Sequence, residues 1–74
     1  MQVMYIDERV SLRDDLPDGL QHDFKILQEY YNNNDWFMFD TVVEEVEASV
    51  KAHYLAGKIS MDDLNSIFRK YGIA

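Results

Sequence analysis

The chain has 74 residues, of which 47% are hydrophobic and 14% aromatic, and its formal net charge is −7. This length suits one domain near the lower limit for independent folding, and the apolar content excludes a disordered chain. The sequence contains no cysteine, which excludes disulfide cross-links and thiolate metal sites. It offers neither a signal peptide nor a stretch of about 20 apolar residues, so we expect a cytoplasmic protein that does not enter a membrane.

The acidic residues are unevenly distributed along the chain. Residues 1–50 carry twelve acidic and three basic side chains, whereas residues 51–74 carry two acidic and four basic ones. Binding to nucleic acid depends on Lys and Arg side chains that displace counterions from phosphates. We therefore expect no nucleic-acid partner.

Residues 1–16 show no helical periodicity. Val3 and Tyr5 alternate with Met4 and Ile6 as in a short strand, but no second strand is predicted to pair with it. We expect an extended N-terminal arm, which either packs across the helices or pairs with the arm of a second copy.

The first helix is expected at about residues 19–32. Asp18 can act as its N-cap with Gln21 three residues later, which is the spacing of a capping box. An apolar face follows from residues that recur every three or four positions, namely Leu20, Phe24, Leu27 and Tyr31.

The second helix, expected at about residues 35–55, has the strongest periodicity in the sequence. Its apolar face consists of Trp36, Phe39, Val43, Val46, Val50 and His53. The opposite side carries Asp40, Glu44, Glu47 and Lys51. Gly57 supplies the stop, because glycine readily adopts the positive φ that follows a helix.

The third helix is expected at about residues 60–71. Ser60 is its N-cap with Asp63 at the third helical position, and Gly72 ends it. Its apolar face consists of Met61, Leu64, Phe68 and Tyr71, with Ile67 beside it. We predict an all-α fold for residues 1–74: a small antiparallel three-helix bundle with an extended N-terminal arm, forming a single helical domain.

The segment GKISMDDL, residues 57–64, resembles the second half of an EF-hand. With Gly57 at the position of the EF-hand glycine, the preceding ligand positions fall on Ala52, Tyr54 and Ala56, which offer no side-chain oxygen suited to calcium. Asp63 alone would occupy a ligand position. We therefore expect no metal ion, and the sequence indicates no cofactor.

The stretch EYYNNNDWFMFD, residues 29–40, is the candidate functional site. Its three asparagines separate two helices, and Tyr30, Trp36 and Phe37 form a candidate partner-binding patch. The alternative is that these aromatics build the core, which the helical spacing of Tyr31, Trp36 and Phe39 favours. We find no catalytic residues, because His53 has no recognisable partner nucleophile and the chain has no glycine-rich phosphate loop.

The sequence therefore predicts a small acidic module without catalytic activity that binds another protein or forms a homodimer. In the dimer, the arm and part of the second helix would meet their copies. The alternative is an acidic inhibitor or nucleic-acid mimic, of the phage or immunity type, that blocks a basic surface. The two differ in salt dependence, because salt screens exposed charges and leaves apolar contacts in place.

Overall fold

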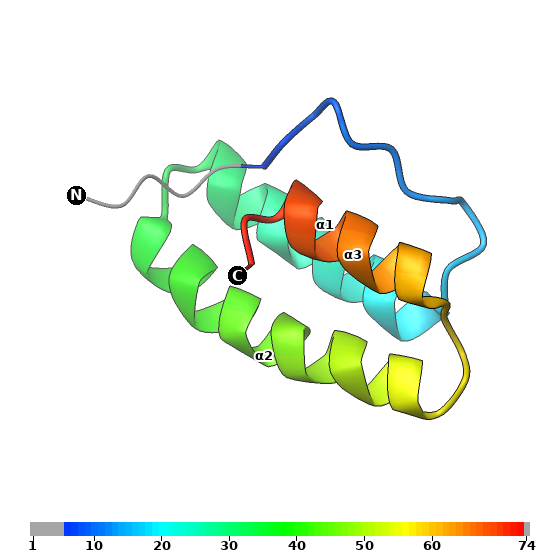
Figure 1. Cartoon of the computed structure of the whole chain (residues 1–74). Coiled ribbons are helices and arrows are strands. Elements are labelled where there is room, and N and C mark those ends of the chain that lie inside the picture. Colours follow the sequence, from blue (N-terminus) through cyan, green and yellow to red (C-terminus); the bar gives the residue numbers. More distant parts are fainter. Residues whose placement is uncertain (1–5, 74) are drawn as a thin grey trace.

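The computed structural model describes residues 6–73, and this part of the chain contains three helices and no strand (Figure 1). Helix α1 spans Asp18–Asn32, α2 spans Trp36–Leu55 and α3 spans Met61–Lys70. Each bound lies within one residue of its expected position. The all-α class is confirmed. The strand considered at the start of the chain involves Val3 and Tyr5, which lie outside the described residues.

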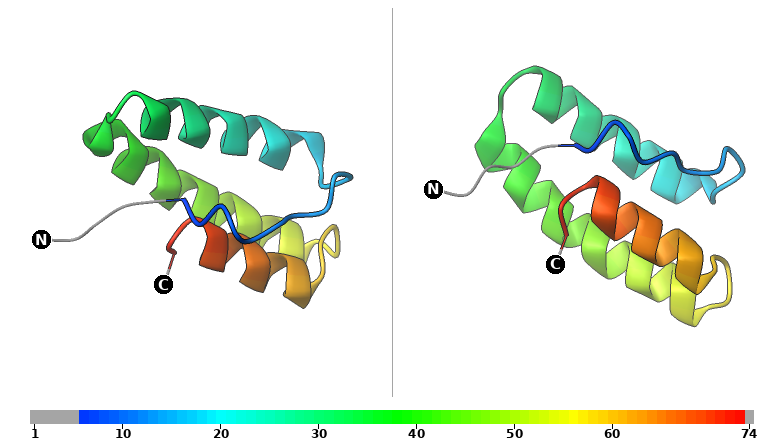
Figure 2. Two further views of the ribbon diagram at one scale, coloured as in Figure 1. Left: turned by 90° about the horizontal axis from the view of Figure 1, so that it is seen from above. Right: turned by 45° about the horizontal axis from the view of Figure 1, so that its top comes forward.

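Helix α2 is the central element of the fold. Both α1 and α3 pack against it, and both lie on its upper side in Figure 1. Residues 6–17 form an irregular segment that runs along α3 before it reaches the start of α1 (Figure 2). The lower side of α2 in Figure 1 is covered by neither of the other two helices.

Residues outside the helices complete the core. The buried apolar side chains are Ile6, Leu16, Leu20, Leu27, Phe39, Val46, Val50, Ile59, Ile67 and Tyr71. Ile6 and Leu16 come from the irregular segment, and Ile59 comes from the connection between α2 and α3. The Tyr71 ring stacks on that of Phe24 from α1, with 5.1 Å between their centroids. The irregular segment and the connection thus contribute to the core that the helices enclose.

Hydrogen bonds fix the irregular segment to α3. The Asp7 amide donates to the carbonyl of Lys70 at 2.7 Å, and Lys70 Nζ donates to the carbonyl of Val10 at 2.8 Å. Nearer α1, the guanidinium of Arg13 pairs with Asp63 at the start of α3. These bonds join residues that are far apart in the sequence, so they depend on the packed tertiary structure.

The start of α1 differs from its expected form. The N-cap residue is Pro17, and no side chain caps the helix, so the predicted N-cap role of Asp18 is wrong. The carbonyl of Pro17 accepts from the amides of Leu20 and Gln21, which brings Asp18 into the first turn. Instead of closing a capping box, the Gln21 side chain donates to the carbonyl of Leu16 at 2.6 Å.

Two residues assigned to apolar faces are exposed. Trp36 is 41% exposed and Met61 is 48% exposed. Each is the first residue of its helix, where the neighbouring helices no longer cover the side chain. In contrast, Ile67 was placed beside the apolar face of α3, and it is fully buried.

Two residues after the end of each helix, the chain has a residue of positive φ. These residues are Asn34, Gly57 and Gly72, with φ of 58°, 75° and 68°. After α2, the Lys58 amide donates to the His53 carbonyl and the Gly57 amide donates to the Tyr54 carbonyl, which is the Schellman arrangement. The predicted stop at Gly57 is confirmed.

Alanine at position 57 is expected to lower the free energy of unfolding by about 1–2 kcal/mol. A Cβ atom there would meet nothing within 4 Å, so the cost is that of a left-handed backbone alone. Gly19 is the matched control, because it is helical and its surroundings are equally open. Gly19→Ala is expected to stabilise by up to about 0.5–1 kcal/mol. Urea unfolding of the two variants checks both signs, and a neutral effect at position 57 would contradict this account.

Candidate partner-binding surface on helix α2

A tight connection between α1 and α2 sets the position of the predicted aromatic patch. Asn34 takes the left-handed conformation, and the Asp35 amide donates to the carbonyl of Tyr30 at 2.9 Å. Asp35 then caps α2, because its Oδ1 accepts from the amide of Met38 at 3.2 Å. These bonds make Trp36 and Phe37 the first two residues of α2.

Trp36 is anchored to the core at one edge. Its ring meets that of Tyr31 edge-on, with 5.7 Å between centroids and an angle of 73° between planes. Tyr31 in turn lies 6.0 Å from the ring of Phe39, which is buried. Trp36 therefore presents part of a large ring to solvent in a defined orientation.

The other two predicted site residues lie in different environments. Phe37 is 78% exposed, and its carbonyl accepts a hydrogen bond from the hydroxyl of Thr41. Tyr30 is partly buried and packs against the core. The structure thus brings Trp36 and Phe37 together at the corner, while Tyr30 supports the core beneath it.

Phe37 belongs to a longer exposed surface, which we call the outer face of α2. It consists of Phe37, Asp40, Thr41, Glu44, Glu45, Ala48, Lys51, Ala52 and Leu55, all of them exposed. Their spacing places them on the side of the helix opposite the buried Phe39, Val46 and Val50. The largest apolar groups stand at the two ends, because Leu55 is 82% exposed. The sequence analysis placed Asp40, Glu44 and Lys51 opposite the apolar side and assigned Phe37 to the aromatic patch, but it did not join them into one face.

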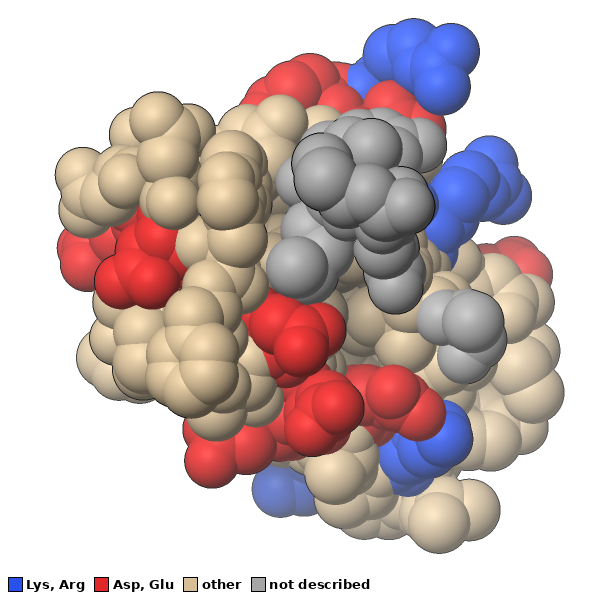
Figure 3. Space-filling model, turned by 90° about the vertical axis from the view of Figure 1, so that its left-hand side faces the viewer, with Lys and Arg blue, Asp and Glu red and all other residues tan. Residues whose placement is uncertain are grey.

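Charge is distributed asymmetrically along this face. Asp40, Glu44 and Glu45 lie in the N-terminal half, whereas Lys51 lies in the C-terminal half. Lys51 Nζ pairs with Glu47 at 2.9 Å and lies 5.9 Å from the centroid of the Phe68 ring, but its side chain remains 55% exposed. Figure 3, which views the molecule from the left-hand side of Figure 1, shows acidic side chains between areas of uncharged ones.

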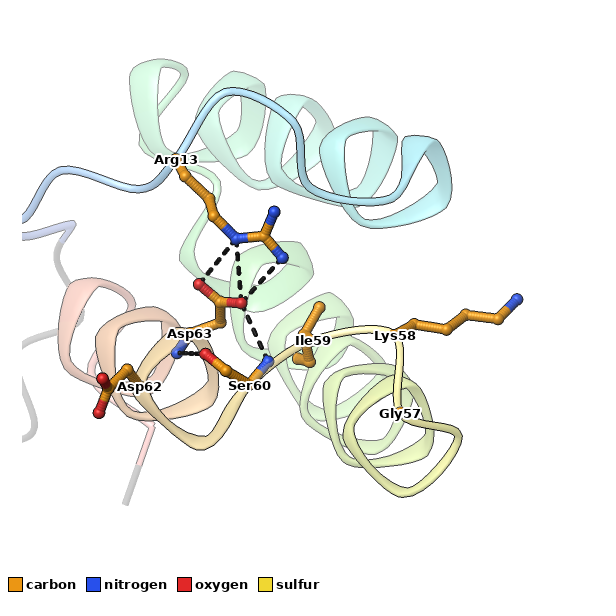
Figure 4. A pocket seen from close by; sticks show the side chains of 7 residues that line it. All are labelled: Arg13, Gly57, Lys58, Ile59, Ser60, Asp62 and Asp63. Carbon is orange, nitrogen blue, oxygen red and sulfur yellow. Dashed lines mark hydrogen bonds and ion pairs between the residues drawn. The ribbon is translucent and has the colours of Figure 1, made fainter.

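The start of α3 forms a second candidate site. A shallow hollow of about 560 Å³ is lined by Arg13, Gly57, Lys58, Ile59, Ser60, Asp62 and Asp63 (Figure 4). The predicted capping box is present, since Ser60 Oγ accepts from the Asp63 amide and Asp63 Oδ2 accepts from the Ser60 amide. Arg13 Nε donates to both Asp63 oxygens at 3.0 Å. Figure 4 shows the Lys58 side chain pointing away from this cluster.

Three of the polar residues of this hollow, Arg13, Ser60 and Asp63, bond to one another. Hydrogen bonds from Arg13 and from the Ser60 amide lower the pKa of Asp63 to about 2 and keep its carboxylate ionised. Asp63 is the residue at the last EF-hand ligand position, and here both of its oxygens are already bound. Within residues 6–73, no group of three or more His, Asp or Glu side chains could hold a metal ion. The arrangement links the irregular segment to α3.

The ion pair between Asp63 and Arg13 makes the stability of the fold depend on pH. Because the pKa in the folded chain, about 2, lies below the ordinary 3.8, the carboxylate stabilises the fold above pH 3.8, and this contribution is lost as the pH falls toward 2. We expect Asp63→Asn to lower the melting temperature at neutral pH and to reduce its fall between pH 4 and pH 2. Asp62→Asn, one residue away and exposed, is the control. An unchanged acid profile in Asp63→Asn would contradict this role.

In comparisons with known proteins, no family model, no curated protein and no solved structure matches the chain. Within residues 6–73, no helix combines the length and the apolar composition needed to cross a lipid bilayer.

Proposed function

We propose that this chain is a protein-binding module without catalytic activity, and that its contact surface is the outer face of α2 together with Trp36. The observation that carries the proposal is the exposure of Phe37 and Leu55 on one side of the same helix. Phe37 lies at the start of α2 and Leu55 at its end, and aromatic side chains are prominent among the residues that contribute most to binding energy at partner sites. The rigid corner at Asp35 supports this assignment, since a preformed surface loses little entropy on binding.

Absence of catalytic activity belongs to the same proposal. At the hollow at the start of α3, the polar groups of Arg13, Ser60 and Asp63 are bonded to one another. His53 Nδ1 lies 2.7 Å from the carbonyl of Ser49 within α2, which orients the ring along its own helix. These contacts support structural roles for the groups that a reaction would need.

The proposal also includes an antiparallel order of the helices and an N-terminal arm that packs on its own chain. The connections of residues 33–35 and 56–60 support the first, because short connections force consecutive helices to reverse direction. Burial of Ile6 and Leu16, and the bond from the Asp7 amide to Lys70, support the second.

A second candidate function is suggested by the charge of the same face. Asp40, Glu44 and Glu45 are exposed there, and acidic residues in this density suit an inhibitor that covers a basic surface. Such a complex would weaken steeply with salt, whereas a complex held by Phe37 and Leu55 would persist.

Affinity capture tests the proposal: the purified chain serves as the bait, and proteins that it retains from an extract of the native host are identified. The baits are the unchanged chain, Phe37→Ala, and Met61→Ala as the control, because Met61 is an exposed apolar residue of a different helix. We expect a partner that is retained by the unchanged chain and by Met61→Ala at low and high salt, and that is lost with Phe37→Ala. Equal capture by all three baits would contradict the assignment of the surface. Loss at high salt alone would favour the acidic inhibitor.

A further inference from the structure

We infer that the outer face of α2 binds the same face of a second copy of this chain, with the two α2 helices side by side and antiparallel. The inference rests on the proposed function, because it names the partner of that surface. The order of residues along the face supports it. When two copies of the helix run in opposite directions, Phe37 of each lies against Leu55 of the other, and Lys51 of each lies beside Asp40 of the other.

The two large apolar residues stand where a two-fold arrangement needs them. Phe37 and Leu55 occupy the same angular position on α2 and are separated by about 27 Å at 1.5 Å rise per residue. A two-fold axis at the level of Val46, midway between them, brings Phe37 of one copy against Leu55 of the other at both ends of the contact. One symmetric contact would thus cover both exposed side chains.

Small residues allow the helices to approach between these ends. Ala48 lies near the centre of the outer face, and Thr41 and Ala52 lie along one side of it, all exposed. In the two-fold arrangement Ala48 faces Glu44 of the second copy, and Thr41 lies beside its Ala52. The short side chain of Ala48 leaves room for Glu44 of the second copy, which keeps the interaxial distance within the usual 8–10 Å.

Charge favours the antiparallel direction over the parallel one. Because the two-fold axis is perpendicular to both helices, the same side of each helix meets its copy. Lys51 of one chain then lies beside Asp40 and near Glu44 of the other, whereas in a parallel pair Lys51 would lie about 16 Å from Asp40 and about 10 Å from Glu44 of the other chain along the helix axis. The antiparallel pair also sets the helix dipoles in opposition.

Like charges oppose the contact at two points. The two Glu44 residues lie about 6 Å apart along the axis near the centre of the contact, where each also has Lys51 of the other copy nearby. The two Glu45 residues approach each other at the outer edge of the contact, where solvent screens them. Each chain also carries a net charge of −7, a repulsion that added salt reduces. The two contacts between Phe37 and Leu55, and the two ion pairs between Lys51 and Asp40, offset this repulsion.

Cysteine pairing tests the arrangement, since the chain has no cysteine of its own. Thr41→Cys and Ala52→Cys change exposed, small residues that the inference places beside each other across the contact. In the antiparallel pair, two copies of Thr41 are about 15 Å apart along the axis, which exceeds the Cα separation of about 7 Å that a disulfide tolerates. Mixing tagged Thr41→Cys with untagged Ala52→Cys under mild oxidation is therefore expected to give the mixed disulfide in about tenfold excess over either self-pair.

Met61→Cys is the control for random collision, because it is exposed on α3, away from the proposed contact.

Sedimentation of the unchanged chain at micromolar concentration, with Phe37→Ala and Leu55→Ala, provides a second measurement that needs no cross-link. We expect a dimer for the unchanged chain and a monomer for each variant, with helical circular dichroism retained. A dominant Thr41 self-pair, pairing no faster than that of Met61→Cys, or a monomer throughout would overturn the inference. If a different captured protein nevertheless required Phe37, the proposed function would stand and only the second copy would be rejected.

Discussion

Replacing Phe39 with alanine is expected to lower the free energy of unfolding by about 3–5 kcal/mol. Phe39 is the largest fully buried side chain, at 1% exposure, and its ring also contacts Tyr31. Truncation removes its buried apolar surface and leaves a cavity between α1 and α2 that close-packed neighbours fill only in part. Urea unfolding monitored by circular dichroism measures the loss directly.

Phe37→Ala is the matched control for this prediction, since it changes the same residue type two positions away on the same helix. Phe37 lies on the outer face, so its removal is expected to change the free energy of unfolding by no more than about 0.5 kcal/mol. Both variants are compared at the lowest protein concentration that the signal allows, where self-association contributes little. Equal losses in the two variants would contradict the assignment of the buried and exposed sides of α2.

Leu16→Ala is expected to cost about 2–5 kcal/mol, although Leu16 lies outside every helix. Its side chain is 4% exposed and belongs to the same core as Ile6 and Ile67. If the segment of residues 6–17 unfolds together with the helices, loss of this side chain destabilises the whole domain. Thermal and urea unfolding would then show one transition, shifted to lower stability.

The control is Leu55→Ala, because Leu55 is exposed at the end of α2 and should tolerate truncation with a change of about 0.5 kcal/mol or less in dilute solution. Hydrogen exchange adds an independent readout. The Asp7 amide bonds to the Lys70 carbonyl, so its protection reports whether the segment stays on α3. Full stability of Leu16→Ala, with rapid exchange at Asp7, would show that the segment is not part of the cooperative fold.

The candidate surface could be predicted in part. Phe37 falls off the apolar periodicity of α2, and this alone marked it as an exposed aromatic. Trp36 fits that periodicity, yet it is exposed because the corner at Asp35 places it at the end of the helix, beyond the cover of its neighbours. Tyr30 falls off the periodicity of α1 and is nevertheless packed against the core. Periodicity describes the sides of one helix, whereas exposure near a helix end depends on what else reaches that far.

The sequence by itself determined the features that rest on short-range interactions. The capping box of Ser60 and Asp63, the stop at Gly57 and the apolar side of α2 at Phe39, Val46 and Val50 each involve residues a few positions apart. Their geometry is therefore set by local backbone chemistry and by the helical repeat.

Only the tertiary structure decided the features that join distant parts of the chain. Ile6 and Leu16 are buried, and Arg13 pairs with Asp63, because the irregular segment lies along α3. The outer face of α2 remains uncovered because α1 and α3 both pack on its other side. No pattern within either segment specifies these contacts, since they form only once the helices have enclosed a common core and their relative positions determine which side chains meet.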